Sequence, residues 1–165
     1  MNLTPKQQQI AVIAGVEIGF GIIEGLVIPN VLHRKKGEAW KIPSAKDAIE
    51  TITTLTITGI ISGYLADLMM EYYKIADTDK RRPYFIAGTA IGVNVIESII
   101  VPNIVGKKLD KSYKFELPSG KVFAGSMLVL SLTAIAGGYT ADTIIANLRK
   151  TQGGDTLASK QLAEN

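Results

Sequence analysis

Residues 18–30, IGFGIIEGLVIPN, occur a second time at residues 91–103 as IGVNVIESIIVPN. Both copies are apolar runs that contain glycine, carry one carboxylate near the middle (Glu24 or Glu97) and end in a Pro-Asn pair. A match of this length within one chain indicates that the second half of the sequence repeats the first.

The matched stretches belong to two of four long apolar segments, which lie at residues 10–32, 51–73, 84–106 and 122–148. Each segment reaches the ~20 residues that a helix needs to cross a bilayer, and none contains Lys or Arg. A soluble four-helix bundle would instead place polar residues every three or four positions along each helix, and that pattern is missing. The sequence therefore predicts an all-α integral membrane four-helix bundle.

The repeat extends into the second and fourth segments. Each contains a small residue, a glycine and an aspartate at the spacing i, i+4, i+8, which lies along one helix face. These residues are Gly59, Gly63 and Asp67 in the first half and Ala134, Gly138 and Asp142 in the second. We therefore expect each aspartate to lie at a contact between helices.

Basic connections follow the first and third segments, at residues 33–50 and 107–121. In this alignment Trp40 lies near Tyr113, and both are candidates for aromatic anchors among lipid headgroups. Together these matches predict a single membrane domain, residues 1–165, built from two parallel repeats of a transmembrane helical hairpin. Repeat 1 covers about 8–73 and repeat 2 about 84–148, and we expect the polar tail, 149–165, to be mobile.

Local signals mark where helices begin. Thr4, Pro5 and Gln7 form a capping-box pattern that starts the first helix before its apolar run. Ser44 with Asp47 is a candidate cap for the second helix. Pro83 is a natural first residue for the third helix.

Glycine spacing predicts close contacts between helices. Glycine inside a helix costs ~1 kcal/mol in water, but it lets membrane helices approach each other closely. The glycines predicted to serve helix packing are Gly15, Gly19, Gly59, Gly63, Gly88, Gly92 and Gly138. The pair Gly15 and Gly19 lies on the helix face opposite Glu24, which indicates partners on both faces and hence an oligomer.

Composition excludes several classes of function. The chain has no cysteine and one histidine, His33, so it offers no thiolate chemistry and no multi-histidine metal site, and we expect neither a metal nor a cofactor. The net charge of +3 comes from Lys and Arg in the connections, a pattern that fits lipid headgroups and not nucleic acid. Intramembrane aspartyl proteases require YD and GxGD motifs, whereas Ala66 and Ala141 precede the aspartates here. We therefore expect a protein that is not an enzyme.

Acidic residues inside the apolar segments are the strongest functional signal. At ~1.5 Å per residue, Glu24 and Glu97 fall about 3 to 5 Å from the centres of their helices, and Asp67 and Asp142 lie nearer the terminal side. Each carboxylate costs about 2.5 to 3.5 kcal/mol at such depth and usually faces a bundle interior or a wet cavity. Because no Lys or Arg lies inside the segments, we expect the acids to be protonated, hydrogen-bonded or bound to a cation.

The Pro-Asn pairs allow two interpretations. If the helix continues through the proline, a backbone carbonyl is freed near each glutamate, with Asn30 and Asn103 a turn away, and these oxygens suit protons, water or hard cations. If the proline ends the helix, a neutral glutamate holds helices together by hydrogen bonds. The residues assigned to the first interpretation, a proton or cation pathway, are Glu24, Glu97, Asp67, Asp142, Asn30 and Asn103.

Two functional hypotheses follow. The first is a non-enzymatic membrane protein with duplicated intramembrane carboxylates lining a proton or cation pathway. The second is a structural or assembly subunit of a larger membrane complex or virion envelope. Both place the chain in a lipid bilayer, in a cell membrane or a virion envelope, with copies of itself or other membrane subunits as partners. The basic residues are spread too evenly over the two sides to fix an orientation.

Overall fold

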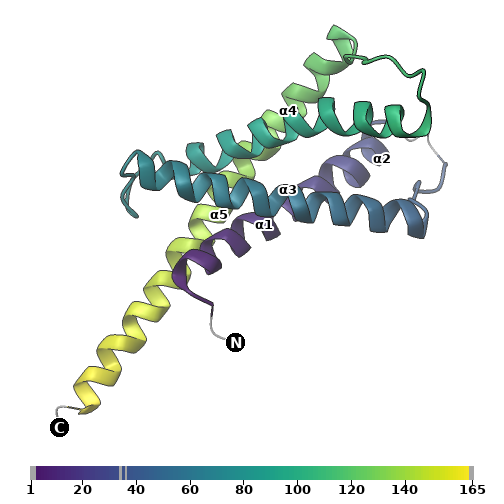
Figure 1. Ribbon diagram of the computed structural model, residues 1–165. Helices are drawn as coiled ribbons and strands as arrows, with labels where there is room; N and C mark the ends of the chain where they lie inside the picture. Colours follow the sequence, from purple (N-terminus) through teal and green to yellow (C-terminus); the bar gives the residue numbers. More distant parts are fainter. Residues whose placement is uncertain (1–2, 34, 36, 164–165) are drawn as a thin grey trace.

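The computed structural model describes residues 3–33, 35 and 37–163, and the regular elements among them are all helices (Figure 1). In chain order they are α1 (Pro5–Ile22), the π-helical turn η1 (Ile23–Val27), α2 (Ile28–His33), α3 (Ala45–Tyr72), α4 (Arg82–Leu109) and α5 (Gly120–Ala163). The prediction of an all-α chain with four long apolar helices is confirmed.

Four segments among the described residues are long and apolar enough to cross a membrane. They are Pro5–Leu32, Ala45–Tyr72, Arg82–Lys108 and Phe123–Thr151. Each overlaps one of the apolar stretches expected from the sequence. The first combines α1, η1 and α2 into one continuous rod, because Ile28 N–H donates to the Ile23 carbonyl, five residues back, and carries the helix through the π turn.

The predicted caps are present. The Thr4 side chain accepts a hydrogen bond from Gln7 N–H at 3.2 Å, and the Gln7 side chain accepts one from Thr4 N–H at 2.9 Å, which completes the capping box. Ser44 accepts from Asp47 N–H at the start of α3. The third long helix begins at Arg82, one residue before Pro83.

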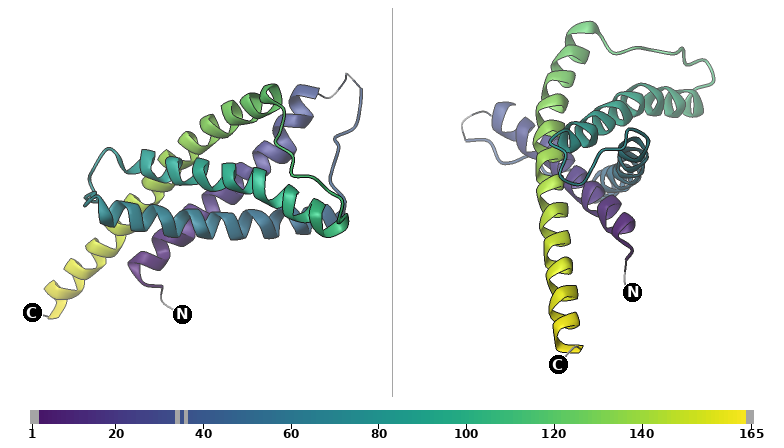
Figure 2. Two further views of the ribbon diagram at one scale, coloured as in Figure 1. Left: turned by 45° about the horizontal axis from the view of Figure 1, so that its top comes forward. Right: turned by 90° about the vertical axis from the view of Figure 1, so that its left-hand side faces the viewer.

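Each long helix packs against two others. α1 contacts α3 and α5, and α4 contacts α5 and α3, so the first hairpin meets the second along both of its helices. Both hairpin loops lie at one end of the molecule, and the termini and the α3–α4 turn lie toward the other (Figure 2). These ends are called here the loop end and the terminal end.

The closest helix contacts occur at glycines. A Cβ on Gly63 would lie 3.0 Å from the carbonyl oxygen of Ile10, and one on Gly59 would lie 3.1 Å from the backbone of Ala14. A Cβ on Gly138 would overlap the carbonyl oxygen of Pro83. α1 therefore crosses α3, and α4 crosses α5, at positions where only glycine fits without a shift.

Four other glycines behave differently from the prediction. A Cβ on Gly15, Gly19, Gly88 or Gly92 would meet no atom within 4 Å. These four glycines therefore make no close helix contact within this chain: Gly15 and Gly19 are exposed, and Gly88 and Gly92 line an open groove between α4 and α3. Spacing alone revealed small residues but not the side on which a neighbour lies.

The buried core is concentrated toward the terminal end. Its main cluster consists of Ile13, Ala66, Met70, Ile75, Ile86, Ala141 and Ile145, and a smaller cluster consists of Ala87, Ala90 and Ala134. Among the described residues of 20–32 and 91–109, in contrast, the buried side chains are those of Asn30 and Asn103. The helices are thus tightly packed toward the terminal end and loosely packed toward the loops.

The polar tail does not leave the helix. α5 continues through Ala163, so residues 149–163, which we expected to be mobile, extend the last helix away from the bundle (Figure 1). Residues 164 and 165 lie outside the described part of the chain.

The prolines of the Pro-Asn pairs lie within helices, and the asparagines form hydrogen bonds to the loops that follow. α4 runs through Pro102 and α2 includes Pro29, so the interpretation of these prolines as helix ends is wrong. The Asn30 side chain accepts from Lys41 N–H at 2.7 Å and donates to the Lys41 carbonyl at 3.1 Å. Asn103 makes the same two bonds to Glu116, at 2.7 and 2.8 Å.

This pair of contacts changes the expected alignment of the loops. Trp40 precedes Lys41, which Asn30 holds in the first loop, and Phe115 precedes Glu116, which Asn103 holds in the second. Trp40 therefore corresponds to Phe115 and not to the region of Tyr113. Each loop is held in extended form against the end of the preceding helix by one buried amide.

Candidate functional site

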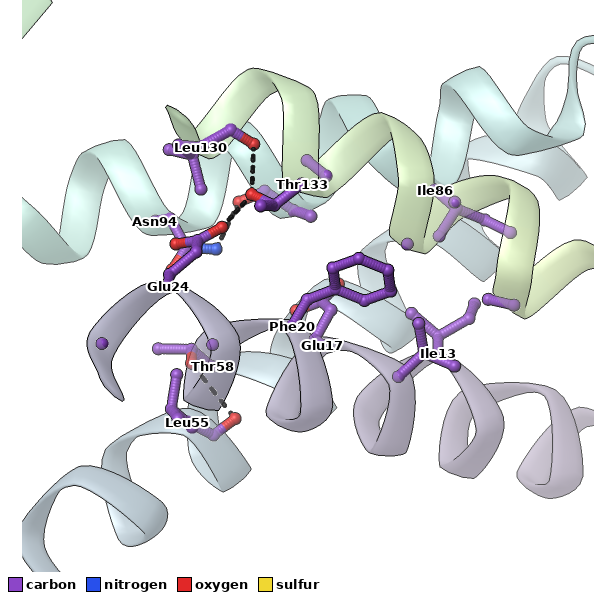
Figure 3. A pocket seen from close by; sticks show the side chains of 18 residues that line it. Ile13, Glu17, Phe20, Glu24, Leu55, Thr58, Ile86, Asn94, Leu130 and Thr133 are labelled. Atoms are coloured by element: carbon purple, nitrogen blue, oxygen red, sulfur yellow. Dashed lines mark hydrogen bonds between the residues drawn. The ribbon is translucent and has the colours of Figure 1, made fainter. Parts of the chain in front are cut away.

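Two of the cavities between the helices share one wall. The first has a volume of about 270 Å³ and is lined by side chains of α1, α3, α4 and α5 together with η1, including Glu17 and Glu24 (Figure 3). The second, of about 240 Å³, lies closer to the loops and includes Glu24 and Glu97. Glu24, Asn94 and Leu130 border both cavities. Three acids thus follow one another along the interior: Glu17, Glu24 and Glu97.

The π turn η1 carries Glu24 into this position. A π turn adds a residue to the helical register, and such turns occur frequently at functional sites. The carboxylate points toward Thr133 of α5, with Asn94 beside it (Figure 3), and accepts a hydrogen bond from the Thr133 hydroxyl. That hydroxyl also lies 3.0 Å from the Val129 carbonyl and 3.1 Å from the Leu130 carbonyl. It has one proton, so it can donate to the glutamate or to the backbone, and a protonated Glu24 can donate to it.

Glu97 has different surroundings. It lies on α4, which has no π turn, and it borders the second cavity together with Ser98 and Ser126. Asn94, one turn earlier, donates to the Ala90 carbonyl at 2.8 Å, which leaves its side-chain oxygen free of that bond. The second cavity therefore presents two carboxylates with amide and hydroxyl oxygens.

Glu17 lies deeper in the first cavity, among apolar side chains that include Ile13 and Phe20. The buried hydroxyl of Ser62, on α3, lies beside its carboxylate. Sequence reasoning left Glu17 out of the site because its counterpart in the second half is Ala90. It also left out Asn94, Thr58 and Thr133, although the two threonines stand at matching positions of the second and fourth segments, a signal that was available.

Asp67 and Asp142 are not unpaired acids. Lys6 lies 2.7 Å from Asp67, and Gln9 donates to the same carboxylate at 2.9 Å. Arg82 donates to Asp142 at 2.8 Å. The expectation that no cation pairs the acids is therefore wrong for these two, because Lys6 and Arg82 lie just outside the apolar segments and reach inward.

A polar network joins all four long helices at this level. Arg82, which is 3% exposed, also donates to the side chain of Gln9 at 2.9 Å and to Asp77 at 3.1 Å. Arg149 donates to Gln9 at 2.9 Å and pairs with Asp77. Because Ile13 and Ile86 are buried between this network and the first cavity, the interior is closed toward the terminal end.

The sequence-assigned residues therefore separate into three places. Glu24 and Glu97 border a common cavity, Asp67 and Asp142 belong to the terminal-end network, and Asn30 and Asn103 hold loops and are not among the residues that line either cavity. Among the described residues, no group of three or more acidic or histidine side chains converges to hold a metal ion.

The chain matches no family model, no curated protein sequence and no solved structure.

Proposed function

We propose that the chain is an integral membrane protein made of two parallel hairpin repeats, α1–α3 and α4–α5, whose interior acids form part of a pathway for protons or small cations. The observation that carries this proposal is that Glu24 borders both cavities, one together with Glu17 and the other together with Glu97. A carboxylate row of this kind gives a positive charge a stepwise route through an apolar interior.

The membrane part of the proposal is supported by what the helices expose. Large apolar side chains such as Ile57, Ile96 and Leu128 are more than half exposed on the outer faces of the helices. Contiguous apolar exposure of this kind is unfavourable in water and favourable in lipid. The polar side chains of the interior, in contrast, are directed toward the cavities or the terminal-end network.

The repeat is supported by matching contacts in the two halves. Gly63 lies against Ile10 as Gly138 lies against Pro83, and Asn30 holds Lys41 as Asn103 holds Glu116. Parallel repeats relate the two halves by an axis along the membrane normal and place their matching acids at similar depth. This depth is where Glu24 and Glu97 come together.

In the proposed pathway, one end reaches the loops and the other end is closed. The cavity that contains Glu97 is lined in part by Pro118 from the second loop, so it reaches the loop end. The other end is closed by Ile13, Ile86 and the network around Arg82. Conduction would require that this end open, because a buried guanidinium repels the cations that the acids attract.

The experiment is a flux measurement in proteoliposomes. Proton and cation uptake are compared between the wild type and the double variant Glu24→Gln plus Glu97→Gln, and we expect the double variant to lose most of the flux. The matched control is Glu50→Gln plus Glu116→Gln, which removes two exposed glutamates near the same loops. No flux in the wild type, or equal flux in both double variants, would contradict the pathway.

The second candidate function is a structural or assembly subunit of a membrane complex or virion envelope. It is favoured by two glycine pairs that have open space beside them, Gly15 with Gly19 and Gly88 with Gly92. In this case leucine at Gly88 and Gly92 would abolish an oligomer detected by cross-linking in membranes, while flux would be absent in every variant.

A further inference from the structure

Glu17 lines the inner end of the first cavity, and Ser62 lies next to it, outside the lining; each has one buried oxygen without a hydrogen-bond partner in acceptable geometry. Ser62 is 0% exposed, and the two oxygens are its hydroxyl oxygen and Oε1 of Glu17. The two groups nevertheless lie side by side on α3 and α1. More than 90% of buried polar groups in proteins are hydrogen-bonded, so two adjacent exceptions indicate a site that takes a further species.

We propose that Glu17 and Ser62 form an inner site for one monovalent positive charge, taken up either as a proton or as Na⁺. This inference rests on the proposed pathway, in which the inner site would be the position farthest from the loops. Glu17 precedes Glu24 by two helical turns, about 10 Å along the helix axis, and both border the same cavity. A charge that leaves Glu24 thus meets the next carboxylate without leaving the cavity.

The charge of the bound species can be inferred from the residues that line the first cavity. The titratable lining residues of the first cavity are Glu17 and Glu24. From α3, α4 and α5 the polar lining residues are Thr58, Asn94 and Thr133, which are neutral. One carboxylate near a hydroxyl in apolar surroundings is neutralised by one positive charge, whereas a divalent ion would leave a charge uncompensated at high cost.

The site occurs once per chain. In the second half the position of Glu17 is taken by Ala90 and that of Ser62 by Gly137, so repeat 2 has neither oxygen. The duplicated pair Glu24 and Glu97 thus provides two matching acids near the middle of the pathway, and the inner site makes the pathway asymmetric. We expect a stoichiometry of one bound charge at this site per chain.

The test measures binding in detergent and needs no flux. Thermal unfolding of the full chain is followed in NaCl and in choline chloride, with Na⁺ alone as the probe. Infrared spectra between about pH 8 and about pH 5, a range above the ordinary glutamate pKa of about 4.3, report the band of a protonated carboxyl while most exposed acids stay ionised. The variants are Glu17→Gln and Ser62→Ala, the second of which removes one oxygen and adds no volume. The control is Glu71→Gln, which changes an exposed acid on α3.

A sodium site predicts that NaCl raises the unfolding temperature of the wild type and of the Glu71→Gln control. Both inner-site variants would then lose about tenfold or more in Na⁺ affinity, the scale of removing a group that supports ion binding. A proton site predicts no effect of Na⁺, but a carboxyl band that grows on acidification, is absent in Glu17→Gln and is shifted in Ser62→Ala.

The proposal is overturned if Na⁺ has no effect and Glu17→Gln removes no pH-dependent band, which includes the case of a band that is constant across the pH range. Failure of the pathway is distinguishable. Binding at Glu17 without flux in liposomes would refute the pathway and leave the site, and flux that survives in Glu17→Gln without binding would refute the site alone.

Discussion

The two halves of the chain share their framework and differ in their polar groups. The same positions make the helix crossing, Gly63 in one half and Gly138 in the other, and the same asparagines hold the loops. Glu24 lies on a π turn and accepts a hydrogen bond from Thr133, whereas Glu97 lies on a regular α-helix. In the proposed repeat, the framework contacts therefore match between the halves, whereas the surroundings of the two glutamates do not.

The terminal-end network shows the same division. Gln9 donates to Asp67 in the first half, and Arg82, at the matching position, donates to Asp142 in the second. Lys6 supplies the positive charge that Gln9 lacks. Each half thus neutralises its own aspartate, and the bond from Arg82 to Gln9 joins the two halves.

The largest effect on stability should come from replacing Arg82 by glutamine, the residue at the matching position of the first half. Arg82→Gln leaves Asp142 without its buried partner, and removal of one partner from such a pair costs about 3 kcal/mol. The neighbouring exposed arginine provides the control, because the ion pair of Arg81 lies at the surface and Arg81→Gln should change stability far less. Thermal unfolding in detergent measures both. Equal losses would show that the pairing of Asp142 does not stabilise the bundle.

The helix crossings offer the next comparison. Gly138→Ala forces α4 and α5 apart because the new Cβ would overlap a backbone oxygen, and we expect a loss of about 1 to 3 kcal/mol. Gly63→Ala meets the Ile10 carbonyl at 3.0 Å and should cost less. Gly92→Ala has open space and is the control, with no loss expected. Unfolding temperatures that rank these variants in another order would contradict the tighter crossing in the second half.

Much of the helical framework could be predicted because it depends on local pattern. The capping residues Thr4 and Ser44, the lengths of the apolar segments and the repeated stretch are all properties of nearby residues. The repeat also identified Glu24 and Glu97 as a pair, and they border one cavity.

The remaining features depend on distant partners. Arg82 reaches Asp142 across sixty positions of sequence, and Asn103 holds Glu116 across thirteen, so neither contact is encoded in a local pattern. The π turn at Glu24 changes the register of the helix by one residue, which no spacing rule anticipated. The outward direction of Gly15 likewise required the position of the neighbouring helices.

The starts of α1 and α4 give the smallest and most specific contrast. α1 begins with the uncharged capping box of Thr4, whereas the turn before α4 is held by Asp79, which accepts bonds from the Arg81 side chain at 2.7 to 3.1 Å and from its backbone N–H at 2.8 Å. These bonds, the side-chain ones foremost, lower the pKa of Asp79 to about 2. A carboxyl with a lowered pKa stabilises the fold above its unfolded pKa of about 4, and the contribution is lost as the pH falls toward about 2.

We therefore expect Asp79→Asn to lower the unfolding temperature slightly at about pH 6 and to have a much smaller effect near pH 2, because Asp79 is then about half protonated and most of its charge-dependent stabilisation is lost. Thr4→Ala removes a cap that does not titrate, so its cost of about 1 kcal/mol should be the same at both pH values. The difference in unfolding temperature between each variant and the wild type, measured at the two pH values, checks this. A pH-independent cost for Asp79→Asn would mean that the turn before α4 is held by its shape and not by charge, and the two halves would then begin their first helices in the same way.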